Sequence, residues 1–145
     1  MTVEFAIRHF RVATVRGHMR VGTLDVRPDD GGLRVDAVID PASVETGNEI
    51  RDERLRSELF AVDAHPSITF SGRESGGRVA GELTICGVTR PIELDVRAEP
   101  RGDGTTLLHA KGELSRRAFG LGWAALGDAG RLIDDRVRVS ADVVA

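Results

Sequence analysis

The stretch Gly81–Val96, GELTICGVTRPIELDV, decides the fold class of this chain. Its apolar residues alternate with polar ones on both sides of a Gly-Val-Thr-Arg-Pro connection at residues 87–91. Such two-residue alternation on either side of a turn predicts an antiparallel hairpin with one apolar and one polar face. Pro91 is expected to open the second strand, because proline cannot donate a ladder hydrogen bond. The apolar face comprises Val79, Leu83, Ile85, Ile92, Leu94 and Val96.

Similar alternation recurs through most of the chain and predicts about eight strands. The phase changes near Gly22, which indicates a bulge or bend. Strands do not alternate with helices, so the chain is expected to be all-β, as either a sandwich or a closed antiparallel barrel. The expected strands cover residues 3–8, 17–27, 33–39, 67–71, 79–85, 92–96, 105–114 and 136–143, with turns at 28–32, 72–77 and 99–104.

Two segments, 40–66 and 116–135, lack this period and predict short helical or looped insertions. In the first segment, residues 43–47 are expected to form a loop. Asn48 is expected to cap a short helix that ends at Ser57.

Charged residues on this helix have structural and functional interpretations. Asp52 and Arg56 stand four residues apart and are expected to support the helix as a pair. The adjacent Arg51 and Asp52 are the most conspicuous charged pair. Their spacing favours an ion pair on the helix surface or a tether for the loop over a ligand contact.

Length and composition predict a globular protein with one domain, covering residues 1–145. Apolar residues make up 41% and charged residues 30% of the chain, and the formal net charge is −3. This charge lacks the basic footprint of nucleic-acid binding, so no nucleic-acid partner is expected. No apolar run is long enough for a transmembrane segment. The N-terminus lacks the pattern of a secretion signal, and we therefore expect a cytoplasmic protein.

Residue types that carry catalysis are scattered along the chain. Cys86 is the only cysteine, and none of the four histidines shares the spacing of a local metal motif. A strained nucleophile turn such as Gly-x-Ser-x-Gly is also missing from the sequence. We therefore expect no enzyme, no metal and no cofactor. An enzyme for small hydrophobic substrates remains an alternative only if two of His9, His18 and His65 meet in a cavity.

The interior of an eight-stranded barrel is either filled by side chains or wide enough for one small ligand. The chain has five phenylalanines and one tryptophan against 17 glycines, and many inward candidates are valine, alanine or glycine. This composition favours an apolar cavity that accepts an apolar guest. The alternative is a barrel packed solid with its own side chains, which would act as a protein-interaction module or a homodimer.

Several blocks of the sequence match the motifs of one family in the right order. They are Ser43–Asn48 with Arg51-Asp52 and Leu55-Arg-Ser57; Phe60, Val62, Pro66, Thr69 and Phe70; Gly81, Leu83, Thr84, Gly87, Val88, Thr89 and Pro91; Phe5, His9 and residues 15–17; and Phe119-Gly120. On these residues the chain resembles the YceI-like lipid-binding (polyisoprenoid-binding) family over nearly its whole length.

The resemblance implies a lipocalin-like antiparallel β-barrel around an apolar tunnel, without catalysis. The implied guest is a polyisoprenoid or similar long-chain amphiphile that the protein binds, stores or transports. The family's Arg-Asp-x-His is here Arg51-Asp52-Glu53-Arg54, and the final hairpins are short, which favours a shorter guest or closure by dimerisation. The residues expected to contact the ligand are Phe5, Phe70, Leu83, Ile85, Leu94, Phe119 and Trp123.

Overall fold

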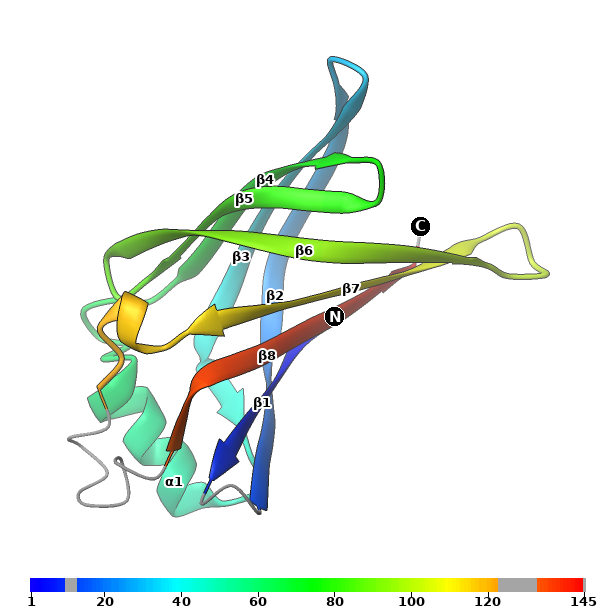
Figure 1. The fold of residues 1–145 in the computed structure, drawn as a ribbon. Helices are drawn as coiled ribbons and strands as arrows, with labels where there is room; N and C mark the ends of the chain where they lie inside the picture. The colour runs from blue at the N-terminus through cyan, green and yellow to red at the C-terminus, as the bar shows by residue number, and fades with distance from the viewer. Residues whose placement is uncertain (10–12, 123–132, 145) are drawn as a thin grey trace.

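The computed structural model describes residues 1–9, 13–122 and 133–144. Within these ranges, eight antiparallel strands follow one another around a closed barrel, in which β8 pairs with β1 (Figure 1). Closure gives each strand two neighbours. The expected lipocalin-like, eight-stranded barrel is therefore confirmed. Its strands are β1 (Thr2–His9), β2 (Ala13–Asp29), β3 (Gly32–Glu45), β4 (Ile68–Ser75), β5 (Arg78–Ile85), β6 (Val88–Pro100), β7 (Thr106–Ser115) and β8 (Ile133–Val144).

The central hairpin forms as predicted, but its turn is shorter. The β5–β6 ladder continues to the pair Ile85↔Val88, so only Cys86 and Gly87 lie between the strands. Both residues have positive φ, 50° and 76°, as the two central residues of a type I′ hairpin turn require. The prediction of a connection at residues 87–91 was wrong, because residues 88–91 already belong to the ladder.

Pro91 lies inside β6 and does not open it. It is paired with Glu82 of β5, whereas the ladder between β6 and β7 begins only at Leu94. Pro91 therefore has a ladder partner on one side only, and such a position tolerates a residue without an N–H group.

The expected irregularity near Gly22 is present, since the β2–β3 register shifts between Val21 and Thr23. A second shift lies between His18 and Arg20. Here Ser43 Oγ accepts a hydrogen bond from the Arg20 amide at 2.7 Å. The Ser43 hydroxyl takes the place of a backbone carbonyl as the hydrogen-bond acceptor at this point of the ladder, and β3 continues to Glu45. The loop predicted from residue 43 therefore begins later than expected.

Asn48 caps helix α1 (Glu49–Arg54) as predicted, and its side chain accepts from the Arg51 amide at 3.0 Å. The helix then widens into a π-helical segment, η1 (Leu55–Leu59). The amide of Phe60 donates to the carbonyl of Leu55 at 2.8 Å, five residues back. α1 itself is therefore shorter than the predicted helix, and η1 continues it past Ser57.

The second insertion contains a single 3-10 turn, η2 (Arg117–Phe119), within residues 116–122. Gly120 ends this turn in the left-handed conformation. β8 begins at Ile133, a few residues earlier than its alternation predicted.

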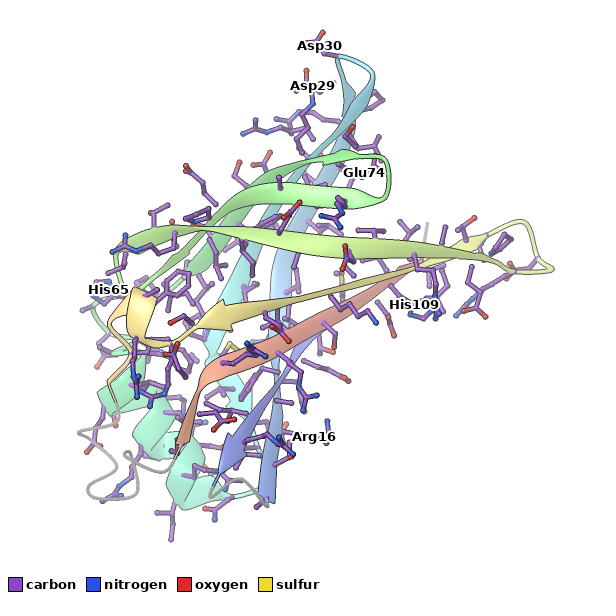
Figure 2. All side chains as sticks on the ribbon, viewed as in Figure 1. Arg16, Asp29, Asp30, His65, Glu74 and His109 are labelled. Carbon is purple, nitrogen blue, oxygen red and sulfur yellow. The ribbon has the colours of Figure 1, made fainter. Side chains whose placement is uncertain are left out.

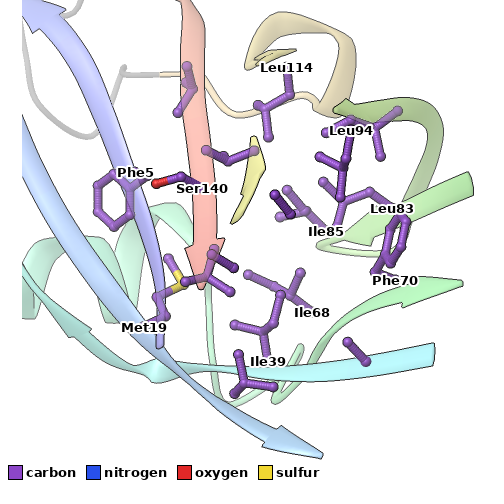
Figure 3. Close-up of a pocket in the computed structure, with 18 of the residues that line it drawn as sticks. Phe5, Met19, Ile39, Ile68, Phe70, Leu83, Ile85, Leu94, Leu114 and Ser140 are labelled. Atoms are coloured by element: carbon purple, nitrogen blue, oxygen red, sulfur yellow. The ribbon is translucent and has the colours of Figure 1, made fainter. Parts of the chain in front are cut away.

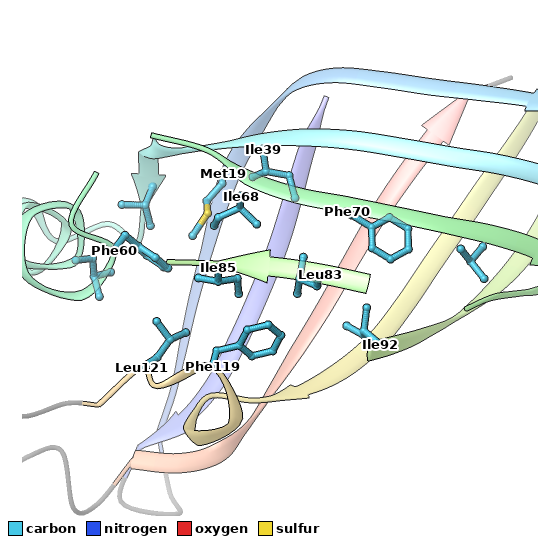
Figure 4. Packing of buried hydrophobic residues seen from close by; sticks show 13 residues of the cluster. Met19, Ile39, Phe60, Ile68, Phe70, Leu83, Ile85, Ile92, Phe119 and Leu121 are labelled. Carbon is cyan, nitrogen blue, oxygen red and sulfur yellow. The ribbon is translucent and has the colours of Figure 1, made fainter. Parts of the chain in front are cut away.

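Helical segments lie at one end of the barrel, whereas the β2–β3 and β6–β7 hairpins project from the other end in different directions (Figure 1). Buried apolar side chains are concentrated at the helical end and extend along the interior (Figure 4). Phe60, Phe119 and Leu121 pack there with Ile85. This packing fixes α1 and η1 against the strands.

Candidate ligand-binding cavity

The barrel encloses an apolar cavity of about 810 Å³. Alternate residues of each strand in the described barrel face this space (Figure 3), because side chains alternate across a sheet. The volume lies in the range of cavities that hold small-molecule ligands, roughly 300–1,000 Å³. The apolar face predicted for the central hairpin is confirmed as an inner face: Val79, Leu83, Ile85, Ile92, Leu94 and Val96 all line the cavity.

Inward-facing glycines do not create this space, contrary to the expectation from composition. A Cβ at Gly81 would lie 2.9 Å from Cε2 of Phe70, and one at Gly112 would lie 2.6 Å from Cδ2 of Leu94. Each glycine is therefore covered by a larger neighbour. The volume results instead from short side chains such as Ala110 among the lining residues.

The residues predicted from the sequence to contact a ligand fall into three groups. Phe119 is buried, with 3% of its surface exposed, but it packs in the core without lining the cavity. Trp123 lies outside the described residues. That any of these side chains contacts a ligand stays a prediction. Those that line the cavity are Phe5, Phe70, Leu83, Ile85 and Leu94.

The helical end of the cavity carries positively charged groups that sequence reasoning did not assign to the site. Arg51 and Arg54 of α1 line the cavity together with Asn48 and Ile50. Residues three and four apart share one face of a helix, and Leu55 continues this face. This helical spacing was the signal in the sequence that could have identified these residues as cavity-lining. The sequence alone, however, did not show which face of α1 meets the barrel.

Arg51 and Asp52 both bind Thr46 at the start of the helical segment. The Asp52 carboxylate is buried, with 2% exposed, and it accepts from the Thr46 amide at 3.0 Å and from the Thr46 hydroxyl at 2.5 Å. The Arg51 guanidinium donates to Thr46 Oγ1 at 2.8 Å and to its carbonyl at 3.0 Å. The loop-tethering role is therefore present, and Arg51 additionally lines the cavity.

The predicted pairing of Asp52 with Arg56 was wrong. Arg56 donates to Glu49 at 2.8 Å and to Glu53 at 3.2 Å. These carboxylates raise the pKa of Arg56, the hydrogen bond to Glu49 contributing most. The exposed acids of α1 therefore pair with Arg56 and do not line the cavity.

Arg116 is a third cavity-lining guanidinium, with only 5% of its surface exposed. It donates to the carbonyls of Asp134 at 3.1 Å and of Ile133 at 3.0 Å. Burial lowers the pKa of Arg116, because removal from water disfavours the charged form. The residue holds the start of β8 to the end of β7 and adds positive charge at the helical end of the cavity. We call the rim of the cavity beside α1, where Ile50 and Arg54 are exposed, the helical mouth.

The hairpin end of the cavity has a different character. Met1, Val26 and Ala98 line it and are exposed. Glu74 is the one acidic residue of the described chain that lines the cavity, and it lies at the β4–β5 hairpin (Figure 2). Its carboxylate accepts from the Gly77 amide at 3.1 Å. The cavity is therefore apolar along its length, basic at the helical end and weakly acidic at the hairpin end.

Cys86 and the histidines whose side chains the structure describes lie outside the cavity lining. These histidines are His18, His65 and His109. Within the described chain, no three histidine, cysteine or acidic side chains group in a way that could hold a metal ion. Separately, none of the helices in residues 1–9, 13–122 and 133–144 combines the length and hydropathy that a membrane span needs.

The closed antiparallel barrel and its apolar cavity define a lipocalin-like barrel protein. Comparison with known proteins makes this more specific, since the profile of the YceI-like domain matches residues 1–145. The chain belongs to the YceI-like domain family. It is also similar to a UPF0312 protein of Staphylococcus aureus, with 30% identity over 152 residues that cover 97% of this chain and 89% of that protein.

Solved structures share the fold at lower sequence identity. BcnA of Burkholderia cenocepacia has a TM-score of 0.80 and 20% identity, and the match covers 99% of this chain and 95% of BcnA. A polyisoprenoid-binding domain from Saccharophagus degradans, implicated in plant cell wall breakdown, has a TM-score of 0.75 and 18% identity. The match covers 99% of this chain and 91% of that domain's chain. A Campylobacter jejuni YceI protein has a TM-score of 0.75 and 22% identity, and the match covers 95% of this chain and 88% of that protein's chain.

Proposed function

We propose that this protein binds a polyisoprenoid or a similar long-chain amphiphile in the barrel cavity and stores or transports it without catalysis. The observation that carries the proposal is a cavity of about 810 Å³ whose wall is apolar from the helical end to the hairpin end. The similarity to the polyisoprenoid-binding domain of Saccharophagus degradans supports the same class of ligand. The expected cytoplasmic location and the expected homodimer stay predictions.

The size of the cavity sets the size of the guest. At about 30 Å³ for each water-sized group, 810 Å³ accommodates a chain of roughly 25 non-hydrogen atoms. Burial of ten methylene groups contributes about 8 kcal/mol before the cost of ordering the chain. Because a Kd of 1 μM corresponds to about 8.2 kcal/mol net, micromolar binding requires burial of more than ten methylene groups, which a guest of roughly 25 atoms supplies.

The alternative of a solid barrel does not fit the interior. A solid barrel requires inward side chains that meet across the axis, whereas the lining residues here leave a continuous space. A role as an interaction module would then depend on the outer surface. Among the described residues, the exposed large apolar side chains are Met1, Val26, Val38, Ile50 and Val144, of which only Val38 and Val144 lie outside the cavity lining.

The proposal is tested by filling the cavity from one wall position. Ala110 faces the cavity from β7, and Ala110→Trp should reduce binding of cis-parinaric acid, whose fluorescence rises in apolar surroundings, by at least tenfold. Ala80→Trp is the matched control, because Ala80 is exposed and does not line the cavity. Gly81→Trp is unsuitable, since a Cβ at Gly81 would lie 2.6 Å from the Gly72 Cα.

Circular dichroism and thermal unfolding establish that both variants retain the fold before binding is compared. Loss of binding in Ala110→Trp alone supports the barrel interior as the site. Equal binding by both folded variants and the wild type would contradict it and would move the ligand to the outer surface.

A further inference from the structure

The two ends of the cavity differ in charge, and this difference bears on how a ligand is oriented. Arg51, Arg54 and Arg116 line the helical end, whereas Glu74 is the one acidic lining residue of the described chain and lies at the hairpin end. A neutral lipid gains nothing from this arrangement. An amphiphile with an anionic head gains Coulomb energy in one orientation and loses it in the other.

Four acidic residues near the helical end are engaged elsewhere and do not cancel this charge at the wall. Glu49 and Glu53 pair with Arg56, and the buried Asp52 accepts from Thr46. Asp135 accepts from Ser115 at 2.6 Å and from the Arg117 amide at 2.9 Å. None of these four acids lines the cavity.

The three arginines have different roles. The guanidinium of Arg51 is held on Thr46, and that of Arg116 donates to the carbonyls of Ile133 and Asp134. Arg54 is exposed at the mouth and has no hydrogen bond or ion pair within the described chain. Its planar group is therefore available to a ligand, and guanidinium binds carboxylate and phosphate with two parallel hydrogen bonds.

The position of Arg54 also suits a head group rather than a chain. It follows Ile50 by one helical turn, and Ile50 is 79% exposed while lining the same mouth. An apolar residue and a free guanidinium at the rim contact the junction between a lipid tail and its charged head. Leu55 and Leu59 continue from this rim into the cavity.

We propose that the cavity selects amphiphiles with an anionic phosphate or carboxylate head, which Arg54 holds at the helical mouth, while Arg51 and Arg116 add positive charge to the cavity wall and the tail extends toward the hairpin end. This inference rests on the proposed function, because it orients a ligand inside the same cavity. It adds a charge class and a direction that apolar contacts alone do not supply.

The direct test compares two probes with the same tail, geranylgeranyl diphosphate and geranylgeraniol, by isothermal titration calorimetry in low salt. The wild type should bind the diphosphate at least tenfold more tightly. Arg54→Gln should weaken diphosphate binding about tenfold, the usual order for one charge-assisted hydrogen bond, and should leave the alcohol within twofold. Arg138→Gln is the control, because it removes the same charge from an exposed position of β8 outside the cavity lining.

The outcomes separate the two proposals. Equal affinity of the wild type for both probes, or an equal effect of Arg54→Gln on both, would overturn the head-group assignment and leave the cavity function standing. Failure of both probes to bind would overturn the cavity function as well. Added salt should narrow the difference between the probes, because the mouth is exposed to solvent.

The direction of the tail has its own measurement. A long-chain fatty acid with a photoreactive diazirine at the end of its tail should label Val96 or Ala98, which line the hairpin end, rather than Leu55 or Leu59. Labelling of the two leucines would reverse the proposed orientation.

Discussion

Phe5 lies over Gly17, its direct partner across the β1–β2 ladder. A Cβ on Gly17 would come within 2.9 Å of Cε1 of the Phe5 ring and within 2.9 Å of the Glu45 carbonyl. The glycine therefore admits the ring against the backbone, and the ring covers the glycine. From this position against Gly17, the Phe5 ring lines the cavity.

We expect Gly17→Ala to lower the free energy of unfolding by about 1–3 kcal/mol, because the added methyl forces the ring and the β3 backbone apart. Urea denaturation measures the change. Gly102→Ala is the matched control, since nothing lies within 4 Å of a Cβ at Gly102. Equal stability of both variants would show that the Phe5 ring moves aside without cost.

His109 links three strands on the outer face of the barrel. Its Nδ1 lies 2.7 Å from Asp142 and its Nε2 lies 3.0 Å from Glu99. The hydrogen bonds to Glu99 and then to Asp142 raise the pKa of His109, against smaller opposing effects of desolvation and of Arg97. The hydrogen bond with His109 in turn lowers the pKa of Glu99.

A raised pKa in the folded state means that protonated His109 stabilises the fold. This stabilisation is fully present below about pH 6.5, the ordinary histidine value, and is lost as pH rises through the raised value. The wild type should therefore exceed His109→Gln in unfolding free energy most at pH 5.5 and least at pH 9. Urea denaturation across this range checks the prediction, and a difference that does not vary with pH would contradict it.

The buried carboxylate of Asp52 holds the segment that leads into α1. Asp52→Ala removes the acceptor for the Thr46 amide and hydroxyl. It should lower the free energy of unfolding by about 2–3 kcal/mol, because hydrogen bonds to a charged group are lost and a half-buried donor is left unpaired. Glu58→Ala, at an exposed position in η1, should change stability by less than about 0.5 kcal/mol. Similar small effects from both substitutions would argue against the tether.

The thiol of Cys86 is held at the β5–β6 turn against the end of η1. Its Sγ donates to the carbonyl of Phe60 at 3.3 Å, and burial raises the pKa of the Cys86 thiol. Because the thiolate is the reactive form, iodoacetamide at pH 7.5 should modify the folded protein at least tenfold more slowly than the urea-unfolded chain. Comparable rates in the two states would show that the turn is open to solvent.

Much of the barrel was predictable because alternation reports directly which face of a strand is apolar. The inward residues of β5 and β6 were identified in this way, as was the bulge at Gly22. Turn length was harder to predict. Cys86 adopts a positive φ that its residue type disfavours, and the proline in β6 has its ladder partner on one side only.

Sequence patterns could not predict the positive charge at the helical mouth, for a physical reason. Arg54 and Arg116 are far apart along the chain and line one cavity only because the strands close into a barrel beside α1. The glycine content led to the wrong expectation that inward glycines leave space in the barrel. Composition cannot show that Phe70 covers both Gly72 and Gly81.

The most direct test of the central claim is mass spectrometry of an organic extract from protein purified out of its own host. We expect a long-chain amphiphile in near-stoichiometric amount. A well-folded preparation that yields no such molecule, and that also fails to take up added cis-parinaric acid, would contradict it.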